Sequence, residues 1–77
     1  MRLVTAFETT EPTIDHVIVW DDDVRLIAYA YQAGQVTRTT PLQTTDPRNA
    51  AAEARRAFGI TTAQQWPQAQ GVAWPTA

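Results

Sequence analysis

The 77-residue chain contains no cysteine, serine or lysine, and it has a single histidine. Without cysteine it can form no disulfide and no thiolate metal site, and the absence is typical of a reducing compartment. The commonest nucleophiles of covalent catalysis are missing as well. The three glycines are isolated and form no phosphate-binding loop. We therefore predict a protein that is not an enzyme and that uses no cofactor.

Long apolar runs are also missing. The apolar segments are far shorter than the ~20 residues that a membrane span needs, and no basic segment precedes an apolar run as in a signal peptide. We expect a soluble, cytoplasmic protein that makes no membrane contact. The length leaves room for one domain, residues 1–77.

The net charge of −2 is unevenly distributed. Residues 1–23 carry six acids and one arginine, which gives −5, whereas residues 24–77 carry five arginines and two acids, which gives +3. A domain that binds nucleic acid strongly is normally basic overall. This chain is not basic overall, and a protein partner is favoured.

The strongest pattern is IDHVIVWDDDVRLIAYAY, in which two runs of β-branched and aromatic residues flank three aspartates. It predicts a hairpin of strands 14–20 and 24–31, because aspartate is typical of turns. Further strands are expected over 2–8 and 36–40, the latter after a turn that contains Gly34. Together they predict an antiparallel meander.

Residues 47–58 predict the helix. Thr45 or Asp46 can serve as its N-cap, Pro47 suits its first turn, and Gly59 suits a left-handed cap at its end. An apolar stripe should face the sheet, formed by Ala50, Ala51, Ala54, Ala57 and Phe58. The solvent side should carry Arg48, Asn49, Glu53, Arg55 and Arg56.

The pattern weakens after the helix. Residues 61–66 predict a short helical turn that Pro67 ends, and we expect Trp66 to join the core. The stretch WPQAQGVAWP has no readable period; in it, Val72 and Trp74 could anchor the tail or form one short strand.

Two hairpin registers are compatible with the aspartates. If Asp22 and Asp23 form the turn, Asp21 opposes Val24; the small aliphatic residues then face the helix and an aromatic–arginine face is left to solvent. If all three aspartates form the loop, Trp20 opposes Val24. Each face of strand 14–20 then lies beside the other face of strand 24–31. Both registers group the same side chains on one face: Arg25, Tyr29, Tyr31 and Arg38.

This predicted group is the main candidate binding surface, and Trp20 joins it in the first register. Aromatic residues and arginine are enriched at protein interfaces, and the same residue types stack on bases and neutralise phosphates. The predicted sheet and helix over residues 14–60 resemble in topology the three-stranded DNA-binding domains of plant ethylene-response factors and integrase arm-binding regions. That resemblance implies nucleic-acid binding as the alternative function.

The acidic turn formed by Asp21, Asp22 and Asp23 is a second candidate binding site. Its carboxylates suit an arginine-rich partner. They lack the alternate spacing and glycine of a calcium loop, so we predict no metal site. His16 stands beside Asp15, but adjacent strand residues point to opposite faces and cannot form a base and its orienting group.

We therefore predict an α+β fold in which an antiparallel sheet of three to four strands packs on one helix, followed by a helical turn and tail. The expected function is non-enzymatic protein–protein interaction, as a small phage-type or regulatory inhibitor of a macromolecular machine. The partner is expected to be another protein or a protein–nucleic acid complex. Open strand edges also allow a homodimer.

Overall fold

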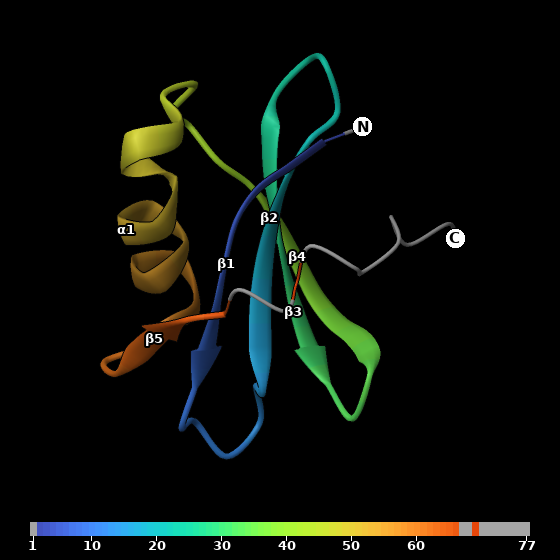
Figure 1. The fold of residues 1–77 in the computed structure, drawn as a ribbon, viewed down its shortest axis with the longest axis vertical. Coiled ribbons are helices and arrows are strands. Elements are labelled where there is room, and N and C mark those ends of the chain that lie inside the picture. The colour runs from blue at the N-terminus through green and yellow to red at the C-terminus, as the bar shows by residue number, and fades with distance from the viewer. Residues whose placement is uncertain (1, 67–68, 70–77) are drawn as a thin grey trace.

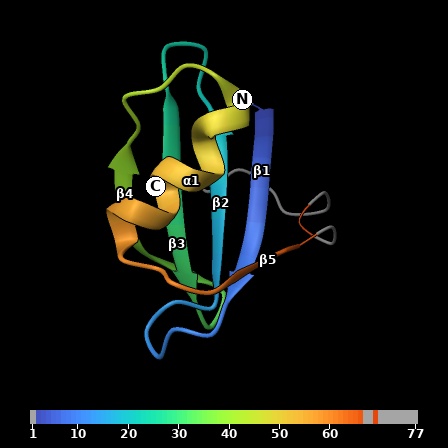
Figure 2. The ribbon, with the colours of Figure 1, turned by 90° about the vertical axis from the view of Figure 1, so that its left-hand side faces the viewer.

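The computed structural model describes residues 2–66 and 69. Its elements are β1 (Arg2–Thr9), β2 (His16–Asp21), β3 (Leu26–Gln32), β4 (Gln35–Pro41), α1 (Pro47–Phe58) and β5 (Ala63–Gln65). The strands form one antiparallel sheet in the order β4-β3-β2-β1-β5, and α1 lies across one face of it (Figure 1, Figure 2). The predicted α+β class is confirmed, with five strands instead of three to four.

The first four strands form the predicted meander, and β5 does not continue it. After α1 the chain returns to the outer edge of β1, where Phe7 pairs with Gln65 and Thr9 with Ala63. The prediction of a helical turn is therefore wrong at residues 63–65. The open edge of β1 offers these residues a hydrogen-bonding partner that is distant in the sequence. The predictions for Val72 and Trp74 lie outside the described residues.

The register of the central hairpin differs from both predicted ones. Asp21 pairs with Leu26, so the loop consists of the four residues 22–25. Relative to the first predicted register, β3 is shifted by two residues. Because side chains alternate with a period of two, this shift preserves the predicted faces of the strands.

One face of the sheet is built from small aliphatic side chains and packs against α1. Val17 pairs with Ala30 and Val19 with Ala28, and all four are fully buried. Ala50 and Ala54 of the helix contact this layer without a large side chain between them. Such small residues let the helix lie close to the sheet. Of the predicted helical stripe, Ala57 alone is exposed.

The opposite face is aromatic. Its buried cluster consists of Ala6, Ile18, Trp20, Tyr31 and Ala69. Leu3, Tyr29 and Trp66 are partly buried against it. This face was expected to be open to solvent, and that expectation is wrong for Trp20 and Tyr31, which are only 4% and 8% exposed.

The ends of α1 follow the predicted caps. The Asp46 side chain accepts a hydrogen bond from the backbone N–H of Arg48, and Pro47 occupies the first turn. Gly59 adopts φ 68°, and Ile60 donates its N–H to the Arg55 carbonyl. This is the Schellman arrangement, in which the residue beyond the glycine makes an apolar contact. Ile60 is buried in the core below the helix.

Candidate interaction site at the hairpin tip

The hairpin tip, residues 21–25, is held by its own carboxylates. Asp22 Oδ1 accepts hydrogen bonds from the backbone N–H groups of Val24 (2.9 Å) and Arg25 (2.8 Å). Asp21 Oδ1 accepts one from the N–H of Asp23 at 2.9 Å. Asp23 adopts φ 74°, a left-handed conformation that aspartate tolerates. The aspartates thus define the shape of the loop as well as its charge.

These hydrogen bonds favour the ionised carboxylates. The backbone N–H groups of Arg25 and Val24 lower the pKa of Asp22. The N–H of Asp23 lowers the pKa of Asp21, and the Arg2 guanidinium, 2.7 Å from Asp21 Oδ2, lowers it further. Among the described residues, no group of three or more metal-ligating side chains is arranged to hold a cation. One oxygen each of Asp21 and Asp22 holds the loop itself, and the second oxygen of Asp21 pairs with Arg2.

Val24 projects from this loop. It is 77% exposed, and it and Val36 (37%) are the exposed large hydrophobic residues of the described part of the chain. Beside it lies a shallow recess of about 110 Å³, lined by Asp21, Asp23, Val24, Arg25, Leu26 and Thr45. The sequence had suggested that Val24 begins a strand. Its place in the loop follows from the observed register.

The predicted cluster of tyrosines and arginines is not brought together. Arg25 lies in the loop at the tip. Arg38 pairs with Ala30 and therefore shares its helix-side face, where the guanidinium carbon lies 5.0 Å from the centre of the Phe58 ring. Tyr29 and Tyr31 lie on the other face. The prediction that both arginines flank the tyrosines is wrong, because it used a register that the hairpins do not adopt.

The aromatic residues form a packed layer. Burial raises the pKa of the Tyr31 phenol, and an interaction with the Trp20 side chain acts in the opposite direction. Tyr29 is half-buried and packs against the same cluster. In this conformation, Trp20 and Tyr31 present little surface to a partner.

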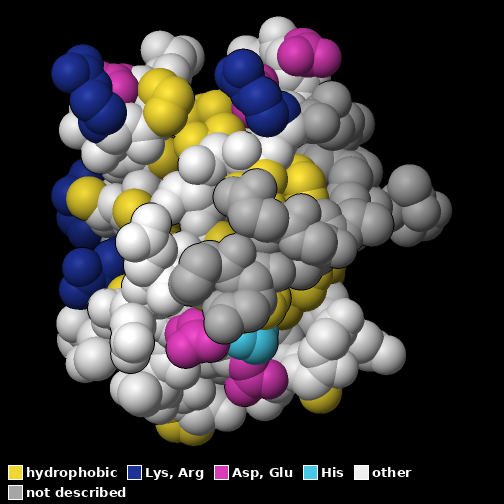
Figure 3. Space-filling model, viewed as in Figure 1, with side chains coloured by type: hydrophobic (Ala, Val, Ile, Leu, Met, Phe, Trp, Pro, Cys, Tyr) yellow, Lys and Arg dark blue, Asp and Glu magenta, His cyan; other side chains and the backbone are white. Residues whose placement is uncertain are grey.

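His16 stacks on Trp66. The ring centroids are 3.8 Å apart and the planes differ by 13°. His16 pairs with Glu8 on one side and with Tyr31 on the other, and acidic side chains border the histidine in Figure 3. The Asp15 carboxylate is engaged elsewhere, since Oδ2 accepts the Ala33 N–H at 2.8 Å. The geometry assigns His16 a packing role at the point where β5 ends.

The open edge of β4 has two features that oppose pairing with another strand. Thr37 is an extra residue between the pairs Tyr31–Val36 and Ala30–Arg38, which makes a bulge. Leu42 donates its N–H to Leu26, so the nitrogen of the adjacent Pro41 faces outward, where it has no hydrogen to donate. Bulges and prolines are common means of protecting an edge. Homodimerisation through β4 stays a prediction.

Comparison of the chain with protein-family models, with curated proteins and with solved structures finds no match. Within the described part of the chain, no helix has the length and apolar character needed to cross a membrane.

Proposed function

We propose that this chain is a non-enzymatic protein–protein interaction domain that presents the hairpin tip to its partner. The proposal rests on Val24, an apolar side chain that is 77% exposed on a loop shaped by hydrogen bonds that the Asp21 and Asp22 carboxylates accept. At this exposure the Val24 side chain buries little surface within the fold. A partner pocket that buried it would gain about 1.5–3 kcal/mol from the hydrophobic effect.

The remainder of the tip suits such a role. Hydrogen bonds within the loop favour one conformation, so less conformational entropy is lost on association. The carboxylates of Asp21, Asp22 and Asp23 would steer the tip toward a partner whose pocket has a basic rim. The sequence predicts in addition that the partner is a macromolecular machine that the domain regulates or inhibits.

Affinity capture with the whole chain as bait tests the proposal. We expect Val24→Ala to lose the captured partner and Val36→Ala, the change at the other exposed valine, to retain it. Asp22→Asn should weaken capture and reduce its dependence on salt. Equal capture by both valine variants, with circular dichroism showing an intact fold, would place the binding surface away from the tip.

The same material tests the nucleic-acid alternative. The sheet face on which that alternative was based carries Tyr29, while Arg38 lies on the opposite face. Direct binding would appear as DNA or RNA affinity at low salt that falls steeply as salt rises. Such binding, unaffected by Val24→Ala, would favour the alternative over the proposed function.

A further inference from the structure

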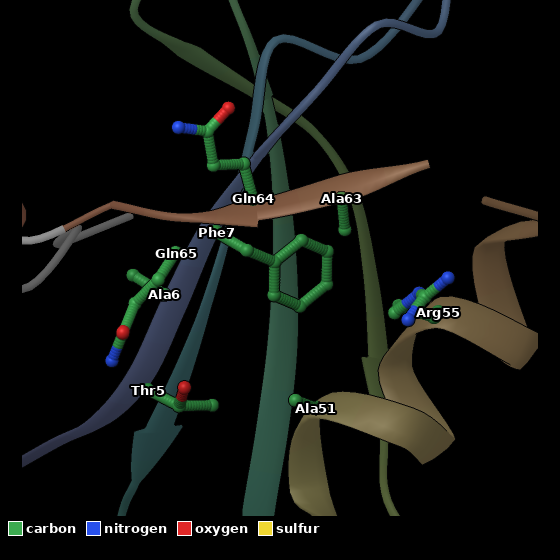
Figure 4. A pocket seen from close by; sticks show the side chains of 8 residues that line it. All are labelled: Thr5, Ala6, Phe7, Ala51, Arg55, Ala63, Gln64 and Gln65. Carbon is green, nitrogen blue, oxygen red and sulfur yellow. The ribbon is translucent and has the colours of Figure 1, made fainter. Parts of the chain in front are cut away.

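A pocket of about 270 Å³ lies where α1 overhangs β1 and β5 (Figure 4). Its walls come from three elements distant in sequence, and they consist of Thr5, Ala6, Phe7, Ala51, Arg55, Ala63, Gln64 and Gln65. The pocket exists because β5 returns to the edge of β1. None of its lining residues belongs to the hairpin tip.

The pocket combines apolar and polar side chains in equal number. Phe7 pairs with Gln65, so both side chains point to the helix side of the sheet, and Thr5 follows by alternation. Ala51 and Arg55 are four residues apart and share one face of α1. Figure 4 shows Ala51 and Arg55 on the helix, across from the Phe7 ring. The lining thus offers an apolar surface at Phe7, Ala51 and Ala63 and polar groups that can orient a ligand.

Arg55 has an unused hydrogen-bond donor at this place. Its Nη2 donates to the Thr61 carbonyl at 2.9 Å, whereas its Nε is buried and has no hydrogen-bond partner among the described residues. Arg2 and Arg48, by contrast, form ion pairs of 2.7 and 2.9 Å with Asp21 and Asp46. Buried donors are nearly always paired in native proteins. The buried, unpaired Nε is unfavourable in the free protein, and an acceptor that drew the guanidinium toward the pocket would satisfy it.

We propose that the pocket binds a small carboxylic acid with a compact apolar group. The carboxylate would accept hydrogen bonds from the Arg55 guanidinium, whose planar donors match it. The apolar group would lie against Phe7, Ala51 and Ala63. At about 270 Å³ the pocket falls just below the ~300–1,000 Å³ of sites for drug-sized ligands. A single arginine as the one charged lining residue suits one carboxylate better than an inorganic phosphate dianion.

Titration of the ¹⁵N-labelled protein with isobutyrate at constant ionic strength tests the site by NMR. We expect a dissociation constant on the order of 1 mM, with shifts of the Arg55 Nε–H signal and of the backbone amides of Ala51 and Ala63. Isobutyramide, which has the same shape without the charge, should bind at least about tenfold more weakly, as judged from the same signals. Inorganic phosphate should also bind more weakly.

Three variants make the test specific. Arg55→Gln should weaken isobutyrate binding by about tenfold or more, whereas Arg56→Gln, at the exposed arginine next to it, should leave it unchanged. Ala51→Leu fills the pocket without altering its charge, and it should abolish the shifts. The exposed Ala57→Leu is its control.

Three results would overturn the proposal. The first is an Arg55 Nε–H signal that does not respond to isobutyrate. The second is equal affinity for acid and amide. The third is equal loss of binding in Arg55→Gln and Arg56→Gln, which would mean that the carboxylate only follows the general positive charge of the helix. None of these results bears on Val24, so they are distinguishable from a failure of the proposed function.

Discussion

The two faces of the sheet are built from different side chains, although the same strands supply both. At the centre of the helix face, valines and alanines of β2 and β3 lie beneath the alanines of α1. The other face is made of larger side chains, with Trp20 and Tyr31 beside Ile18. The comparison shows two ways to bury surface in a small domain: close approach of a helix, and large rings on the face away from α1. We therefore expect the aromatic face to be destabilised most by removal of a large side chain, and the helix face by insertion of one.

The largest effect is expected on the aromatic face. Trp20→Ala should lower the free energy of unfolding by about 3–5 kcal/mol, because it removes a buried ring and leaves a cavity. That is a large share of the stability of a domain of this size. Val19→Ala, one residue away on the helix face, removes only two methyl groups and should cost less. Urea unfolding followed by circular dichroism measures both, and a smaller loss for Trp20→Ala than for Val19→Ala would contradict the aromatic face as a core.

A smaller effect, of opposite origin, is expected on the helix face. Ala54 is fully buried between α1 and the sheet. Ala54→Leu should cost about 1–3 kcal/mol, because the added atoms force the helix away from the sheet. Ala57→Leu changes an exposed residue of the same helix and should stay within about 0.5 kcal/mol of the parent protein. Equal costs at the two positions in thermal or urea unfolding would mean that the helix does not lie closely on the sheet.

The smallest effect depends on pH and should arise on the aromatic face, because the buried residues of the helix-face cluster include no ionisable group. Burial raises the pKa of Tyr31 above its usual value of 10.0. The folded protein therefore holds this proton more tightly than the unfolded chain does. The stabilisation is present below pH ~10 and is lost as the pH rises through the folded-state pKa.

Unfolding measured at pH 8 and at alkaline pH should accordingly show a loss of stability in the parent protein that is reduced in Tyr31→Phe. Tyr29 remains in that variant and serves as an internal control for general alkaline effects. An identical pH profile in both proteins would show that the Tyr31 phenol is not buried in solution.

Much of the architecture follows from local sequence. The helix and both of its caps were predicted at the residues observed, because Asp46, Pro47 and Gly59 act through bonds within a few residues. The meander was predicted from the period-two pattern of its strands. Strand β5 was missed because its three residues carry no strand signal of their own; they pair only because the edge of β1 is available.

The residues of the candidate sites also differ in whether local sequence could identify them. Asp21, Asp22 and Asp23 were identified from sequence at the turn and lie in the tip, although the loop itself consists of residues 22–25. Val24 and Arg55 were not identified as site residues, because no local sequence pattern distinguishes them from their neighbours. Arg55 and Arg56 are adjacent arginines that the sequence assigned alike to the solvent side of the helix. In the structure the first is half-buried at the pocket beside β5 and the second is exposed.

The sequence by itself determined the helix and the four strands of the meander, because backbone preference, capping and side-chain period act over short distances. Only the tertiary structure decided the length of the central loop, the face on which Arg38 lies, and the pocket beside Arg55. These features depend on which backbone groups far apart in the chain pair with one another. A shift of two residues in that pairing leaves the hydrophobic pattern intact and moves functional side chains to new positions.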